Sequence, residues 1–311
     1  MKLRNLGSSG LQVSLVGLGC NNFGGRSDME ASRKVVHKAL DEGITLFDTA
    51  DIYGNQLSET YLGECLGDRR KDIVLATKFG MAMDPAGKKK GGSRRYIMSA
   101  VEASLKRLRT DWIDLYQVHR PDALTPIEET LRALDDLVRQ GKVRYIGCSN
   151  FPSWQVVEAM WTAKGAGLGG FVSYQDEYSL VMRDLEKELM PAAKAYGVGL
   201  LPYFPLASGL LTGKYKRGEK PAAGTRFAGT PNLGERYMTP RNLDKVEALQ
   251  KFVAARGKTM LELALSWLAQ RPTVASVIAG ATKPEQIEQN VKAVGWTLTP
   301  EEMAEIDKLT A

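Results

Sequence analysis

Four side chains with complementary chemistry stand at the ends of short apolar runs or just after them: Asp48, Tyr53, Lys78 and His119. Lys78 ends the run "IVLATK", and a buried lysine is costly unless a carboxylate pairs with it. Asp48 ends a similar run, "TLFD", so we expect these two residues to form a buried ion pair. Such a pair can change the acidity of a third group placed beside it.

The third group is the phenol of Tyr53, which follows Asp48 on the same loop. An ammonium beside a phenol favours the phenolate, so we expect Lys78 to lower the pKa of Tyr53 from its ordinary value of about 10. The phenol would then donate a proton near neutral pH. A neutral His119 could hydrogen-bond a carbonyl oxygen and orient it. Each residue alone also has an ordinary structural explanation, as a turn aromatic, a snorkelling lysine or a loop histidine. Only their combination predicts acid catalysis.

Eight short apolar runs, separated by segments of helical period, must position these groups. This alternation predicts parallel strands joined by crossover helices. Eight such units close into a barrel more readily than they open into a sheet. We therefore predict an α/β protein with a single (β/α)8 TIM barrel domain over residues 1–311. The predicted strands are 14–20, 45–50, 73–78, 113–119, 143–149, 171–175, 198–204 and 276–280.

Other segments complete the predicted barrel. Helices are expected at 29–43, 94–110 and 126–141 from their periodicity and end signals. Residues 2–14 contain two short runs around Gly-Ser-Ser-Gly, which predicts an N-terminal β-hairpin that plugs the barrel floor. Residues 207–240, after the seventh strand, are rich in Gly, Pro, Lys and Arg and show no period. We interpret this long loop as a lid.

Catalytic groups in parallel barrels lie where strands end and the following loops begin. Polar residues occupy those positions on six of the predicted strands. Because these ends meet at one rim, the sequence predicts a single site there. The residues are Asp48, Lys78, His119, Ser149, Asn150, Gln175 and Tyr203.

Composition restricts the class of protein. Hydrophobic residues make up 43% of the 311 and charged residues 25%, as in ordinary globular proteins. No apolar run is long enough to cross a bilayer and the N-terminus lacks a signal-peptide core, which predicts a cytoplasmic protein with no membrane partner. Three cysteines without a CxxC pair and two histidines argue against a disulfide framework and against a protein-held metal.

The net charge of +6 raises the question of an anionic partner. The positive residues are spread along the chain and mostly alternate with acids, which argues against nucleic acid. One concentrated basic patch consists of Lys88, Lys89, Lys90, Arg94 and Arg95. It is either a solvated loop or a funnel for a phosphate-bearing ligand.

The blocks "GITLFDTADIYG", "LATKFG" and "YQVHRPD" resemble the aldo-keto reductase superfamily, over almost the whole chain. By this resemblance Asp48, Tyr53, Lys78 and His119 correspond to the catalytic tetrad of that family. The blocks "GCSN", "YQDEYSL" and "YFPLASGLLTGKY" agree with it. The resemblance implies a monomeric enzyme that reduces small aldehydes or ketones to alcohols by hydride transfer, with Tyr53 as the proton donor.

The resemblance also implies a nicotinamide cofactor across the barrel mouth, NADPH with NADH as the alternative. Ser149, Asn150 and Gln175 correspond to the carboxamide-binding residues of the family, and Tyr203 to the aromatic that stacks on the nicotinamide. With Asp48, the other implied contacts are Leu206, Ser208, Gly209, Lys214 and Arg226 at the pyrophosphate, and Gly280, Thr282, Gln286 and Asn290 on the side of the adenosine phosphate.

The chain departs from the family pattern in two places. Many members carry a basic residue where this chain has Gln286, so Lys283 is a candidate for the missing positive charge. Some members place a tryptophan of the substrate pocket where this chain has Arg120. An arginine there favours polar or anionic substrates, or it pairs with Asp122.

Two rival functions stay open. A Schiff-base aldolase would use Lys78 as its nucleophile, although an ion pair with Asp48 would keep that amine protonated. A redox-sensing, NADPH-binding subunit of slow turnover would be similar to the channel-associated β subunits of the superfamily. The start of the chain at the hairpin disfavours this rival, because such subunits often carry an N-terminal extension. The motifs "GAGLGG" and "GLLTGKY" lack the context of a Rossmann turn and the spacing of a P-loop.

Overall fold

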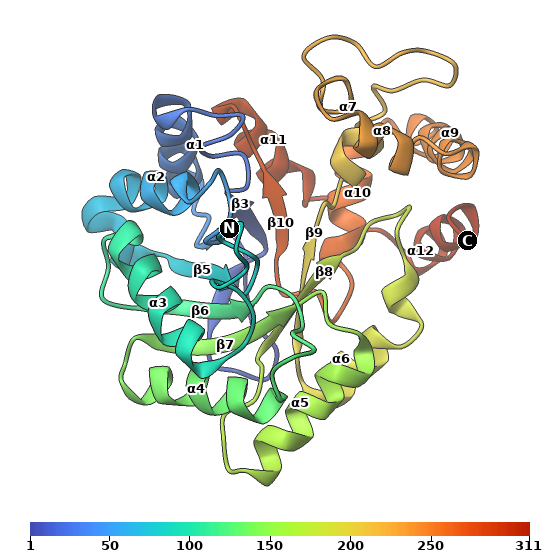
Figure 1. Cartoon of the computed structure of the whole chain (residues 1–311). Coiled ribbons are helices and arrows are strands. Elements are labelled where there is room, and N and C mark those ends of the chain that lie inside the picture. The colour runs from blue at the N-terminus through green and yellow to red at the C-terminus, as the bar shows by residue number, and fades with distance from the viewer.

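Eight strands pair side by side and in parallel around a barrel in the structure, a computed structural model that describes residues 1–311 (Figure 1). Their order is β10-β3-β4-β5-β6-β7-β8-β9. Each predicted strand segment overlaps one of them, with β5 and β8 ending one and two residues beyond the predicted segments, so the predicted α/β barrel is confirmed. The strands are β3 (Val16–Gly19), β4 (Leu46–Asp48), β5 (Val74–Phe79), β6 (Ile113–Val118), β7 (Val143–Ser149), β8 (Ser173–Glu177), β9 (Gly199–Tyr203) and β10 (Val277–Gly280).

The barrel closes between β9 and the residues just before β10. The amide of Leu200 donates to the carbonyl oxygen of Thr273 at 2.8 Å, and the amide of Ala275 donates to the carbonyl oxygen of Leu200 at 2.9 Å. These bonds satisfy backbone groups that an open sheet would leave unpaired at its edge. The C-terminal ends of the eight strands therefore meet at one rim.

Helices pack around the outside of the barrel (Figure 1). The predicted helices 29–43, 94–110 and 126–141 are confirmed as α1, α3 and α4. None of the helices is long and apolar enough to cross a membrane. The α-helices are α1 (Met29–Asp41), α2 (Leu57–Leu66), α3 (Arg94–Leu108), α4 (Ile127–Arg139), α5 (Ser153–Gly165), α6 (Leu189–Tyr196), α7 (Arg226–Gly229), α8 (Pro231–Tyr237), α9 (Pro240–Ala254), α10 (Met260–Ala269), α11 (Pro284–Ala293) and α12 (Pro300–Leu309), and the 3-10 helices are η1 (Gly67–Asp72), η2 (Asp184–Glu186) and η3 (Ala207–Thr212).

An antiparallel hairpin, β1 (Leu3–Asn5) with β2 (Gln12–Ser14), precedes the barrel. Its apolar residues Leu6 and Val13 are fully buried. They belong to the same buried cluster as the inward-facing strand residues Leu46, Ala76, Leu115, Leu201 and Ile278. The hairpin therefore fills one end of the barrel interior, as predicted, and leaves the opposite rim available for a site.

The long segment after β9 contains more regular structure than the sequence suggested. It forms η3, α7 and α8, which lie together with α9 on one side of the barrel (Figure 1). Its own aromatic stack holds it: the ring centroids of Tyr215 and Phe227 lie 4.3 Å apart, and those of Phe227 and Tyr237 6.2 Å apart. Helices this short show no periodicity in the sequence, because they depend on aromatic packing, and the role of the segment as a lid stays a prediction.

Candidate active site

A cavity of about 630 Å³ opens at the C-terminal rim of the barrel. A cavity of this size is suited to a cofactor or drug-sized ligand. Every residue of the predicted site lines it except Lys78 and Asn290. Lys78 lies fully buried beneath the wall, and Asn290 is buried on α11. The tertiary structure thus brings together positions from seven different strands and their loops.

Asp48, at the end of β4, forms the buried ion pair expected with Lys78 of β5. Its Oδ2 atom accepts from Lys78 Nζ at 2.6 Å. Its Oδ1 atom accepts from Gln175 Nε2 at 2.9 Å and from Gln117 Nε2 at 3.3 Å. Both carboxylate oxygens of Asp48 therefore have donors, as a buried carboxylate requires.

All three hydrogens of the Lys78 ammonium have acceptors. Besides Asp48, Nζ donates to the carbonyl oxygen of Thr49 at 2.9 Å and to the hydroxyl of Tyr53 at 3.4 Å. Burial by itself would lower the pKa of Lys78, but the charges and hydrogen bonds of Asp48 and Tyr53 outweigh it and raise the pKa. The amine is therefore cationic and engaged on all sides, which does not suit a nucleophile.

The acidity of Tyr53 differs from the expectation. We expected Lys78 to lower the pKa of Tyr53, but the pKa is raised above its ordinary value. Burial has the larger effect, the negative charge of Asp48 adds to it, and Lys78 offsets only part of the two. The raised pKa keeps the phenol protonated through the neutral range, which is the form that a proton donor requires.

His119 lies beside Tyr53 at the end of β6. The two ring centroids are 5.7 Å apart and the rings are nearly perpendicular, at 83°. Burial, with the charges of Lys78 and Arg120, lowers the pKa of His119 to about 3. Its Nδ1 atom is buried without a hydrogen-bond partner. A neutral imidazole with an unused nitrogen is able to bind an oxygen of a ligand.

This shifted pKa predicts a pH dependence of stability. Above the ordinary pKa of 6.5 the folded and unfolded states are both neutral at His119, so the contribution to stability is fully present. Between 6.5 and about 3 the unfolded chain binds a proton that the folded chain does not, so the stability falls as the pH is lowered, by at most about 1.4 kcal/mol per pH unit. We expect His119→Gln to show a shallower fall in the free energy of unfolding from neutral pH to mildly acidic pH, measured by chemical denaturation. His37→Gln is the control, and an equal slope in His119→Gln and the wild type would contradict the assignment.

Asn150 organises the next strand end. Its backbone is left-handed, with φ of 59°, which asparagine tolerates better than most residues. Its Nδ2 atom donates to the carbonyl oxygen of His119 at 3.0 Å and to Ser149 Oγ at 2.9 Å. Its Oδ1 atom accepts from the hydroxyl of Tyr203 at 2.8 Å. One side chain therefore links β6, β7 and β9 and orients the ring of Tyr203.

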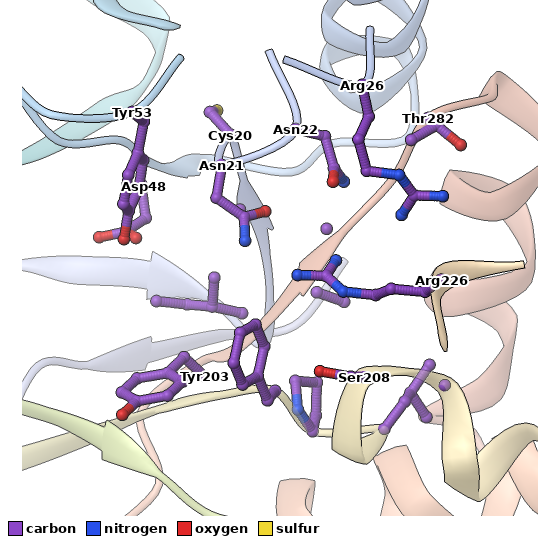
Figure 2. A pocket seen from close by; sticks show the side chains of 18 of the residues that line it. Cys20, Asn21, Asn22, Arg26, Asp48, Tyr53, Tyr203, Ser208, Arg226 and Thr282 are labelled. Carbon is purple, nitrogen blue, oxygen red and sulfur yellow. The ribbon is translucent and has the colours of Figure 1, made fainter. Parts of the chain in front are cut away.

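The other end of the cavity is strongly positive. Figure 2 shows the guanidinium groups of Arg26 and Arg226 pointing into the same part of the cavity from opposite walls. Lys214 and Lys283 also line it, and none of these four cations pairs with a carboxylate. Burial, with the charge of Arg26, lowers the pKa of Arg226. Unpaired cations that face one another favour a bound polyanion.

Some of the residues predicted on the α11 side line the cavity and one does not. Gln286 lines the cavity, but its Oε1 atom accepts from the amides of Thr282 and Lys283 at 2.8 and 3.3 Å, which caps α11. Gly280 and Thr282 line the cavity directly. Asn290 does not line it and is 5% exposed.

Sequence reasoning missed several residues that support the site. Gln117, a second donor to Asp48, lies two positions before His119 on β6, so strand alternation could have indicated it. Glu59 is fully buried on α2, where it accepts from Thr77 Oγ1 and from Arg107 Nε, both at 2.6 Å. This network anchors the helix after the loop of Tyr53, and no local motif predicts it.

The chemistry of the cavity lining is suited to an extended dinucleotide. Its positive end is suited to phosphates, and the hydroxyl of Ser208 there is buried without a partner. Amide side chains at the opposite end are suited to a carboxamide, and an aromatic ring, Tyr203, stands beside them. The cavity therefore has a charged half and a half that carries acid–base groups.

Comparisons with known proteins place this geometry in context. Residues 15–311 match the model of the "Aldo/keto reductase family". The chain is 40% identical to a "Probable voltage-gated potassium channel subunit beta" of Arabidopsis thaliana, with 94% of this chain and 91% of that protein covered. It is 39% identical to the "Uncharacterized oxidoreductase YrpG" of Bacillus subtilis, covering 97% and 93%, and 35% identical to the "L-glyceraldehyde 3-phosphate reductase" of Escherichia coli strain K12, covering 99% and 92%.

Proposed function

The chain belongs to the aldo/keto reductase family, and on that premise we propose that it is an NADP(H)-dependent oxidoreductase that reduces an aldehyde or ketone to an alcohol. One observation carries the proposal: a buried ammonium, Lys78, contacts both its carboxylate partner Asp48 and the hydroxyl of Tyr53 at the wall of the cavity. A phenol that a buried ammonium contacts in this way is suited to acid–base catalysis.

The chain supplies the proton and the electrostatic setting of the reaction. When bound, the dihydronicotinamide supplies the hydride that the carbonyl carbon accepts. The Tyr53 hydroxyl passes its proton to the carbonyl oxygen as negative charge develops there, and Lys78 stabilises the phenolate that remains. Neutral His119 donates a hydrogen bond to the same oxygen and orients it. The burial that keeps Tyr53 protonated also strengthens these interactions.

The chain also supplies residues that would hold the cofactor. Ser149, Asn150 and Gln175 would bind the carboxamide, and Tyr203 would contact the nicotinamide ring. The pyrophosphate would be held by Leu206, Ser208, Gly209, Lys214 and Arg226, with Arg26 from the opposite wall. Gly280, Thr282, Gln286 and Asn290, with Lys283, would form the adenosine phosphate side; Asn290 would act there as a buried support.

A carbonyl panel tests the proposal. The protein is incubated with NADPH or NADH and a series of aldehydes and ketones, and nicotinamide absorbance is followed. We expect faster oxidation of NADPH than of NADH. The absence of oxidation with every carbonyl would overturn the proposal, and borohydride trapping of an adduct on Lys78 would favour the aldolase instead.

Lys283 is the residue that we expect to recognise the extra phosphate of NADPH. It lines the cavity at the start of α11 and has no ion-pair partner. Lys283→Gln removes one charge-assisted hydrogen bond, so the ratio of NADPH to NADH affinity should fall by about tenfold. Fluorescence titration of both cofactors measures the ratio. Lys194→Gln, at an exposed lysine of α6, is the control, and an unchanged ratio in Lys283→Gln would reject this role.

A second candidate function is supported by the comparisons. Relatives named as probable potassium channel β subunits cover almost the whole chain at 39 to 40% identity. An NADPH-binding subunit of slow turnover would use the same cavity. Recovery of a stoichiometric membrane protein partner, together with negligible turnover on the carbonyl panel and retained NADPH binding, would favour this candidate over the reductase.

A further inference from the structure

We propose that Arg120 binds an anionic group of the substrate, a phosphate or a carboxylate carried on the same molecule as the reactive carbonyl. This inference rests on the proposed function, because it names the class of substrate that the proposed reductase takes. It makes Arg120 a specificity-determining residue rather than part of the acid–base machinery.

Arg120 occupies the position that a substrate-recognising cation needs. It directly follows His119 at the end of β6 and lines the mouth of the cavity, with an exposed side chain. Its guanidinium makes no hydrogen bond and no ion pair with any residue of the chain. The planar guanidinium, with its N–H donors, is therefore available to bind two oxygens of a phosphate or carboxylate.

The ordinary structural explanation for Arg120, an ion pair with Asp122, does not hold. The Asp122 carboxylate instead accepts from the amide of Gly92 at 2.8 Å, from the amide of Leu124 at 3.0 Å and from the hydroxyl of Thr125 at 2.7 Å. Through these bonds Asp122 stabilises the conformation of its own loop. Arg120 has no structural partner left.

The charges around the cavity separate into two groups. Six cations line it against a single acid, Asp48, which Lys78 already neutralises. Four of the cations lie at the end proposed for the phosphates of the cofactor. Only two remain toward the carbonyl end: Arg120 and Arg236. The cofactor phosphates therefore leave the charge at the carbonyl end unmatched.

Arg236 already has a structural role in the fold. Its guanidinium pairs with Glu177, whose other oxygen accepts from the hydroxyl of Tyr237. This contact ties α8 to the end of β8. Arg120 is thus the free cation at the carbonyl end.

Arg120 also lies within electrostatic reach of the groups that would handle the carbonyl. Its charge contributes to the lowered pKa of His119, and it offsets part of the rise that burial causes in the pKa of Tyr203. Arg120 directly follows His119, and the ring of Tyr53 lies 5.7 Å from that of His119, so an anion bound to Arg120 would place the rest of a short substrate near these two groups.

A neighbouring basic loop strengthens the attraction for anions. The bond from Gly92 to Asp122 joins the loop after β5 to the loop of Arg120. Lys88, Lys89 and Lys90 are exposed on that first loop. Clustered surface charge of one sign raises the local concentration of oppositely charged ligands and is screened by salt. The funnel for an anionic ligand stays a prediction.

The test compares paired substrates that differ only in the anionic group. The pairs are glyceraldehyde 3-phosphate with glyceraldehyde, and succinic semialdehyde with butanal, and kcat/KM is measured with NADPH. We expect the wild type to favour the anionic member by about tenfold or more in at least one pair, which tells phosphate from carboxylate. Arg120→Gln should lower kcat/KM for that anionic member by about 10- to 100-fold, mainly through KM, and change the neutral member by less than about threefold.

Controls separate this inference from the proposed function. Arg120→Lys should recover part of the lost preference, and Arg139→Gln, at an exposed arginine in the last turn of α4, should leave it unchanged. Calorimetric titration with glycerol 3-phosphate, with and without NADPH, measures anion binding even if no carbonyl is reduced. Equal loss for both members of each pair, or equal binding of glycerol 3-phosphate by wild type and Arg120→Gln, would overturn the role of Arg120. Absence of turnover with retained, Arg120-dependent binding would reject only the proposed reductase.

Discussion

Replacing Tyr53 by phenylalanine is expected to lower kcat for carbonyl reduction by about 10²- to 10⁴-fold, the usual contribution of a positioned general acid. The phenol is the group with a dissociable proton that Lys78 contacts directly, at 3.4 Å. Phenylalanine keeps the ring beside His119 but has no proton to give. Because the hydroxyl acts on the developing alkoxide, the affinity for NADPH should change by less than about threefold.

Stopped-flow hydride transfer and fluorescence titration of NADPH measure the two quantities separately. Tyr61→Phe, at a partly buried tyrosine of α2, is the matched control and should keep wild-type turnover. Turnover of Tyr53→Phe within about threefold of the wild type would show that another group donates the proton. A parallel loss of NADPH affinity would point to a structural defect.

Replacing Asp48 by asparagine is expected to lower the free energy of unfolding by about 3–5 kcal/mol, as in other buried ion pairs that lose one partner. The side chains of Lys78 and Asp48 are 0% and 4% exposed. With a neutral amide at position 48, the ammonium of Lys78 stays buried without its counter-ion. Turnover should fall as well, because Lys78 loses the partner that keeps it charged beside Tyr53.

Urea denaturation at neutral pH measures the change in stability. The double variant Asp48→Asn/Lys78→Met removes the unpaired charge and should recover part of the loss, giving a positive coupling energy. Asp184→Asn breaks an exposed pair with Lys187 and should cost at most about 1 kcal/mol. If the double variant is no more stable than Asp48→Asn, the isolated charge of Lys78 is not the cause of the loss.

The sequence could predict which residues lie on the barrel rim wherever strand register alone decides it. Asp48, His119 and Gln175 end predicted strands, and parallel strands of a closed barrel place such residues together whatever the loops do. Gln117 was within reach of the same argument, because alternation along β6 turns it inward. These features depend on local period and backbone geometry, which the sequence carries directly.

The burial of the site residues and their hydrogen-bond and ion-pair partners could not be predicted in the same way. The pKa of Tyr53 depends on how completely the cavity wall excludes water, and the sign expected from Lys78 alone was wrong. The availability of Arg120 depends on the bonds that Asp122 accepts, one of which comes from Gly92 on a loop 30 residues away. Helical turns in the segment after β9 required the packing of Tyr215, Phe227 and Tyr237.

The sequence by itself therefore determined the alternation of strands and helices, the family, and the identity of the residues that end the strands. The tertiary structure decided which of those residues are shielded from water, which charges are neutralised and which cation is left free. The physical reason is range: periodicity and strand register act between near neighbours of the chain, whereas desolvation and charge pairing depend on every element that packs around a group.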